Sequence, residues 1–188
     1  MSLRTFIALD LDEPIRRKLM AVRDWLVSPA DRVRLVESRN LHVTLNFLGD
    51  VPDGLAGDVC SIVQQAADRI EPFSFEVRGI QVVPPAGAVR MLWAKVSDSS
   101  GQMAKLYEQL SLGLAGLGLR GEDRRFKPHV TIMRIKSLKA PAAMRHQARE
   151  YADELFGLQH ADEVVAYTSQ LGSAGAVYTP MMRAELGR

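Results

Sequence analysis

The sequence has little of several features that mark particular classes of protein. Cys60 is the single cysteine, so no disulfide forms within the chain, and a reducing cytoplasm is the expected location. No run approaches the roughly 20 apolar residues that a membrane helix needs, so we expect no membrane association. The opening MSLRTFIALDLDEP is acidic where a signal peptide would be cleaved, so we expect no export signal.

An excess of one charge is also missing. The 24 Lys and Arg residues nearly balance 22 Asp and Glu residues, giving a formal net charge of +2, whereas general nucleic-acid binders are strongly basic. One stretch, LRGEDRRFKPHV, differs, because four basic residues precede a histidine there: Arg120, Arg124, Arg125 and Lys127. This run is either a solvated loop or a phosphate contact.

The motifs of several enzyme classes are absent. There is no HExxH or CxxC spacing for zinc, no GxSxG, no GxxxxGK[ST] and no GxGxxG. Cys60 lies in the helical pattern DVCSIVQQAADRI, which predicts a buried, inert thiol. His146 lies on a polar helix and His160 in a loop, and both are expected at the surface. We therefore expect no metal and no cofactor.

Apolar periodicity and turn residues predict an α+β protein. Helices are expected over residues 12–26, 53–70, 102–117 and 141–155, and strands over residues 4–11, 33–36, 41–49, 73–83, 88–96, 129–135, 164–171 and 176–186. No low-complexity linker divides the chain, and the order of elements repeats approximately. The sequence therefore predicts one domain, residues 1–188, with two pseudo-symmetric lobes of antiparallel sheet and flanking helices around a central cleft.

Two of the expected strands carry the same short pattern, HVTL at residues 42–45 and HVTI at residues 129–132. Alternate side chains of a strand share a face, so His42 and Thr44 should point together, as should His129 and Thr131. Val43, Leu45 and Phe47 are then expected in the core. Two such strands facing a cleft would present two imidazoles and two hydroxyls to one ligand.

Two histidines suit concerted acid–base chemistry near neutral pH, because one imidazole accepts a proton while the other donates one. Cleavage of a phosphodiester needs both, and threonine hydroxyls can donate to the phosphoryl oxygens. Arg134 has the opposite parity from His129 and Thr131. Either the strand bulges and Arg134 reaches the phosphate, or Arg134 is a structural partner behind the sheet. Phe126 either stacks on a base or anchors its loop.

The paired motifs resemble those of the two-histidine phosphoesterase superfamily. Within it, the chain is most similar to the bacterial and archaeal RNA 2′,3′-cyclic phosphodiesterases, first described as 2′-5′ RNA ligases (LigT). The likeness covers RTFIALDLDEPIRRKL, NLHVTLNFLGDV, VRMLWAKV, RRFKPHVTIMRI and SQLGSAGAVYTPM. It implies opening of a 2′,3′-cyclic phosphate at the 3′ oxygen to leave a 2′-phosphate, and joining of RNA ends through a 2′-5′ bond, without ATP or metal.

The resemblance also implies roles for single residues. His42 would donate a proton to the leaving 3′ oxygen and His129 would accept one from water, while Thr44, Thr131, Arg134 and Phe126 would bind substrate. The expected partners are RNA 3′ ends with a 2′,3′-cyclic phosphate, tRNA fragments included, and the expected state is a monomer. Two alternatives stay open: a non-catalytic module that binds RNA ends, and a phosphodiesterase for small cyclic nucleotides.

Overall fold

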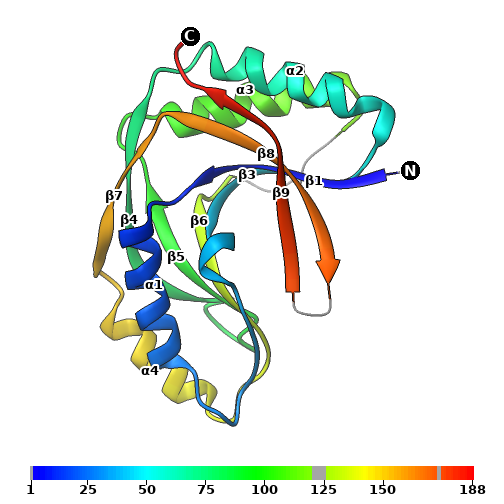
Figure 1. Ribbon diagram of the computed structural model, residues 1–188. Coiled ribbons are helices and arrows are strands. Elements are labelled where there is room, and N and C mark those ends of the chain that lie inside the picture. The colour runs from blue at the N-terminus through cyan, green and yellow to red at the C-terminus, as the bar shows by residue number, and fades with distance from the viewer. Residues whose placement is uncertain (1, 120–125, 173–174) are drawn as a thin grey trace.

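One curled antiparallel sheet runs through the computed structural model, which describes residues 2–119, 126–172 and 175–188 (Figure 1). Its strands are β1 (Ser2–Asp10), β2 (Arg32–Leu35), β3 (His42–Pro52), β4 (Phe73–Val83), β5 (Met91–Ser97), β6 (His129–Ser137), β7 (Leu155–Ala161), β8 (Glu163–Gly172) and β9 (Gly175–Glu185). The order across the sheet is β7-β4-β5-β6-β3-β1-β8-β9, and β2 pairs with β6.

The centre of the sheet is its narrowest connection. β3 and β6 share a single register pair, Val43 opposite Val130, whereas the strands on either side pair along much of their length. The sheet therefore divides into one lobe with β6, β5, β4 and β7 and a second lobe with β3, β1, β8 and β9. The expected α+β fold with two lobes of antiparallel sheet is confirmed.

In the described ranges, four α-helices cover the lobes in an exchanged arrangement. They are α1 (Glu13–Leu26), α2 (Ala56–Ala67), α3 (Gln102–Gly116) and α4 (Pro141–Glu150). α1 follows β1 of the second lobe but packs against β6 and β7 of the first, whereas α3 follows β5 of the first lobe and packs against β3 of the second. α2 and α3 lie together at the top of Figure 1, and α1 and α4 at its lower left. Among the described residues, no helix is both long and apolar enough to cross a membrane.

The C-terminal third differs from the sequence expectation at one element. The helix expected over residues 141–155 ends at Glu150, and the strand β7 follows it, so His160 lies in a strand and not in a loop. His160 is exposed at the surface, as expected, and so is His146. The sequence does not indicate this strand, because its buried face carries a polar residue, Gln159. The Oε1 atom of Gln159 accepts a hydrogen bond of 2.7 Å from the backbone N–H of Asp12.

The close approach of α1 to β7 depends on Gly157. A Cβ atom at Gly157 would lie 2.6 Å from Cγ1 of Ile15, a residue that is 3% exposed. We expect Gly157→Ala to lower the free energy of unfolding by about 1–3 kcal/mol, as overpacking of a filled core does. The matched control is Gly57→Ala on α2, where nothing lies within 4 Å of the added Cβ atom. Thermal or urea unfolding of both variants measures the difference, and equal stability of the two would contradict this packing.

Candidate active site

The two HVT motifs meet at the junction of the lobes. Because Val43 and Val130 pair in antiparallel register, His42 lies opposite Thr131 and Thr44 lies opposite His129. Both valines are fully buried, and the histidines and threonines are partly exposed on the other face. In a regular antiparallel ladder, diagonal neighbours on one face lie about 7–8 Å apart, which leaves room for one phosphate between the two imidazoles.

Each imidazole is held in the same way. Nδ1 of His42 lies 2.8 Å from the carbonyl oxygen of Asn40, and Nδ1 of His129 lies 2.8 Å from the carbonyl oxygen of Lys127. A carbonyl only accepts, so Nδ1 carries the hydrogen in both rings, and Nε2 is the nitrogen that gains or loses a proton. Nε2 of His42 lies 2.9 Å from Oγ1 of Thr44.

An aromatic ring from the neighbouring strand supports each imidazole. Phe6 of β1 stacks on His42 with ring centroids 4.8 Å apart, and Trp93 of β5 stacks on His129 with centroids 3.6 Å apart. Tyr178 of β9 meets the His42 ring edge-on at 5.6 Å. Stacking on one side and a carbonyl hydrogen bond at Nδ1 restrict the rotation of each ring, so the two Nε2 atoms keep their direction.

A bulge in each central strand changes which side chains face the cleft. On β6 the register steps from Leu92 opposite Met133 to Trp93 opposite Thr131, so Ile132 is an extra residue, and Ile132 and Met133 are both buried. The bulge reverses the alternation, and Arg134 lines the cavity beside Thr131. Of the two alternatives for Arg134, the structure has the bulged strand.

A second bulge, on β3, corrects the expectation for Phe47. On β3 the register steps from Ala8 opposite Thr44 to Ile7 opposite Asn46, so Leu45 is the extra residue. Strict alternation predicts Phe47 in the core. In the structure Phe47 points out of the core, lines the cavity and is 37% exposed. The guanidinium carbon of Arg4 lies 4.9 Å from the centre of its ring, a cation–π contact.

The cavity beside the motifs is large and positively charged. It measures about 600 Å³, and its lining includes three arginines, Arg4, Arg34 and Arg134, against one acid, Glu37, a balance of 3 − 1 = +2. Arg34 and Arg134 lie directly opposite each other in the β2–β6 register. Among the described residues, neither pairs with a carboxylate. Like charges in this position repel, so the arrangement favours a bound anion.

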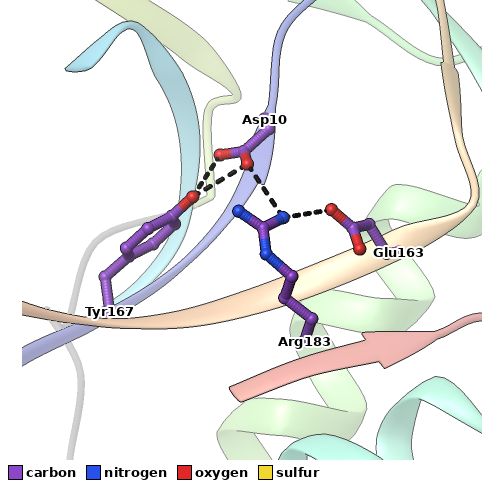
Figure 2. Close-up of polar contacts among 4 residues, drawn as sticks. All are labelled: Asp10, Glu163, Tyr167 and Arg183. Atoms are coloured by element: carbon purple, nitrogen blue, oxygen red, sulfur yellow. Dashed lines mark hydrogen bonds and ion pairs between the residues drawn. The ribbon is translucent and has the colours of Figure 1, made fainter. Parts of the chain in front are cut away.

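The side chains of Asp10, Tyr167, Arg183 and Glu163 form a polar network (Figure 2). Asp10 is the register partner of His42, and its two oxygens accept hydrogen bonds of 2.8 Å from the Tyr167 hydroxyl. Arg183 bridges Asp10, at 3.4 Å, and Glu163. Burial and the hydrogen bond to Asp10 raise the pKa of Tyr167, so this hydroxyl stays protonated and continues to donate.

Opposing influences act on the pKa of His42. Burial is the largest and lowers the pKa, because it penalises the charged imidazolium. The Asn40 carbonyl and the Asp10 carboxylate raise the pKa, and the positive charges of His129 and Arg134 lower it. The outcome is a pKa below the ordinary value of the imidazole, so His42 of the substrate-free protein loses its proton more readily than a free histidine does.

The remaining sequence candidates lie away from this cavity or outside the described residues. The Phe126 ring stacks on Tyr107 of α3 with centroids 4.3 Å apart, and Phe126 is not among the residues that line the cavity, which favours the loop-anchor alternative. Arg120, Arg124 and Arg125 lie outside the described residues. Cys60 is partly exposed, and burial raises the pKa of its thiol, which suits an inert residue. Within the described part of the chain, no three His, Cys, Asp or Glu side chains are grouped to hold a metal.

Comparison with known proteins connects this geometry to a family. The sequence profile of the 2′-5′ RNA ligase superfamily matches residues 11–162. The RNA 2′,3′-cyclic phosphodiesterase of Methanothermobacter thermautotrophicus is 32% identical over 181 residues, which span 96% of this chain and 97% of that protein. The chain belongs to the 2′-5′ RNA ligase superfamily. The resemblance seen in its two motifs is confirmed.

Solved structures of similar proteins share the fold of this member of the 2′-5′ RNA ligase superfamily. A crystal structure from Thermus thermophilus has a TM-score of 0.84 at 29% identity and covers 98% of each chain. Escherichia coli LigT, solved in complex with 3′-AMP, has a TM-score of 0.83 at 23% identity and covers 100% of each chain. The latter shows a likeness of fold.

Several residues that line the cavity of this superfamily member belong to no motif in its sequence. Phe6, Tyr178, Arg4 and Arg34 all line the cavity. Phe6 and Arg4 share a face of β1, and Arg34 lies in the short strand RVRL, but nothing in the sequence tells which strands pair with β3 and β6.

Proposed function

We propose that this chain is a metal-independent RNA 2′,3′-cyclic phosphodiesterase. The observation that carries the proposal is the pair of identically held imidazoles, each fixed through Nδ1 by the carbonyl two residues before it, beside an arginine-lined cavity. The protein of Methanothermobacter thermautotrophicus that matches nearly the whole chain is named for this activity. A binding module would have no need of two titrating imidazoles in this arrangement.

The proposed reaction opens the cyclic phosphate in one displacement. Nε2 of neutral His129 accepts a proton from water, whose oxygen forms a bond to phosphorus while the bond from phosphorus to the 3′ oxygen breaks. Nε2 of protonated His42 donates its proton to that 3′ oxygen. The product is a 2′-phosphate with a free 3′ hydroxyl, and exchange of protons with solvent restores both histidines.

The second requirement of the reaction is stabilisation of the negative charge on the phosphoryl oxygens. Thr44 and Thr131 lie at diagonal positions on the paired strands β3 and β6, and the bulge of β6 brings Arg134 to the same cavity. Hydrogen-bond donors fixed before the substrate arrives stabilise the transition state without reorganisation. We assign phosphate binding to these three side chains, with Phe126 as a remote loop anchor.

The setting of the activity is proposed on the same grounds. The substrates are RNA 3′ ends with a 2′,3′-cyclic phosphate, among them tRNA fragments, and a 5′ hydroxyl in the place of water would give a 2′-5′ bond. We propose that residues 1–188 act as a single domain, because one sheet runs through both lobes. We also propose that the protein is a monomer in the cytoplasm.

Product analysis tests the function. A short RNA ending in a 2′,3′-cyclic phosphate should yield a 2′-phosphate end at the same rate with and without EDTA, because no step uses a metal. Adenosine 2′,3′-cyclic phosphate serves as the comparison substrate and tests the small-nucleotide alternative. Activity that disappears in EDTA and returns with zinc or magnesium would refute the metal-free mechanism, and binding without turnover would support the RNA-end module.

The lowered pKa of His42 sets an expected pH dependence. As the acid, His42 must be protonated, so kcat/KM falls as pH rises through the pKa of the free protein, which lies below the reference of about 6.5. Bound phosphate is negative and raises that pKa, so the alkaline limb of kcat should lie at higher pH than that of kcat/KM.

Asp10→Asn removes a negative charge that raises the pKa of His42, so it should move the alkaline limb of kcat/KM to lower pH. Coincident limbs above about 6.5 would contradict this assignment.

A further inference from the structure

A second cavity adjoins the first on the side of His42. It measures about 280 Å³ and shares Asn40, His42 and Tyr178 with the cavity described above. Three arginines line it, Arg16, Arg39 and Arg183, against a single acid, Asp10. The proposed reaction uses none of these arginines.

Two of the arginines already have partners. Arg183 is held by Asp10 and Glu163 (Figure 2). Arg39 lies 2.8 Å from a carboxylate oxygen of Glu37. Each of these arginines is neutralised by its carboxylate partners, of which Arg183 has two, so neither leaves an unpaired positive charge in the cavity.

Arg16 is the exception. No carboxylate among the described residues pairs with it, and its Nε atom is buried without a hydrogen-bond partner. A buried donor left unpaired destabilises a fold, so an acceptor from outside the protein is the natural partner. The guanidinium fork binds phosphate oxygens in pairs, which makes phosphate the matching chemistry.

The position of the cavity indicates which phosphate would reach it. If His42 protonates the 3′ oxygen, then the ribose of the terminal nucleotide lies on the His42 side of the site. The next phosphate of the same strand is attached to the 5′ oxygen of that ribose. Arg16 comes from α1, which packs on the other lobe from His42, so a ligand here would contact both lobes.

We propose that the Arg16 cavity is a subsite for the phosphate on the 5′ side of the terminal nucleotide. The inference rests on the proposed function, since the substrate must be a nucleotide with its 2′,3′ end at the histidines. It implies that the protein distinguishes an RNA end from a nucleoside that carries a phosphate only at its 2′ or 3′ position.

Binding of two product-like nucleotides tests the subsite independently of turnover. Calorimetry should give a Kd for adenosine 2′,5′-bisphosphate about tenfold lower than for adenosine 2′-monophosphate, the scale of one charge-assisted contact. Arg16→Gln should remove the difference. The matched control is Arg17→Gln, since Arg17 is 72% exposed and pairs only with Glu13 among the described residues, and it should keep the difference.

Two results would overturn the subsite: equal Kd values in the unaltered protein, or a preference that survives Arg16→Gln. Should Arg16→Gln fail to fold, the ratio of the two Kd values is measured in the unaltered protein at rising salt. An ionic contact weakens as salt rises, so a ratio that does not fall with salt would overturn the subsite. Failure of the proposed function appears separately, as no hydrolysis of a cyclic-phosphate RNA by a protein that still prefers the bisphosphate.

Discussion

His129→Ala and His42→Ala should each lower kcat on a cyclic-phosphate RNA by roughly 10²–10⁴-fold, the usual contribution of a positioned acid or base. Both side chains face the cleft and not the core, so the variants should fold normally, which circular dichroism and thermal unfolding would verify. A variant that keeps more than about a tenth of kcat would show that its imidazole is not the group that transfers the proton.

A leaving group that needs no proton separates the two roles. In bis(4-nitrophenyl) phosphate the departing 4-nitrophenolate is stable as an anion. His42→Ala should therefore recover most of its lost rate on this substrate, whereas His129→Ala should not, because water must still be deprotonated. Recovery of His129→Ala alone would reverse the assignment, and recovery of neither would count against a mechanism with two histidines.

Arg134→Gln should lower kcat by roughly 10²–10³-fold, as the loss of one fixed donor to a charged transition state does. The same change removes a positive charge that lowers the pKa of His42, so the alkaline limb of kcat/KM should move to higher pH. Rates measured across the pH range give both quantities from one data set.

The matched control is Arg32→Gln on β2. Arg32 is exposed, carries the same charge and does not line the cavity, so its replacement should change kcat little. Equal losses in the two variants would indicate a general effect of charge and would remove Arg134 from the phosphate site.

The alternation of a strand was enough to predict the two histidines and two threonines, but it stopped being valid three residues into each motif. Leu45 and Ile132 are both apolar, and nothing in their side chains indicates that each is the extra residue of a bulge. A bulge arises from the pairing of two strands, which a single sequence does not display. For that reason the sequence pattern predicts the wrong face for Phe47 and does not decide between the two positions of Arg134.

Contacts between segments far apart in the chain also determine β7 and part of the cavity, and a local sequence pattern does not reveal such contacts. Gln159 lies on the buried face of β7, where its side chain accepts a hydrogen bond from the backbone at the start of α1, 147 residues earlier in the chain. A polar residue at a buried position interrupts the apolar pattern by which a strand is predicted. Phe6 and Tyr178 come from the two ends of the chain and meet with ring centroids 4.8 Å apart beside His42. Local patterns predict elements well, whereas a site assembled from both ends of the chain needs the fold.

The exchange of helices between the lobes has a mechanical consequence for the catalytic pair. α1 is covalently continuous with the lobe of His42 but buries its apolar face on the lobe of His129, and α3 makes the reverse connection. Separation of the lobes would expose the apolar faces of both helices at once. The packing of α1 and α3 therefore stabilises the junction between β3 and β6, although these two strands share only one register pair. The spacing of the two imidazoles is thus maintained by buried surface far from the reaction, and loss of that surface would loosen the site before any catalytic group changed.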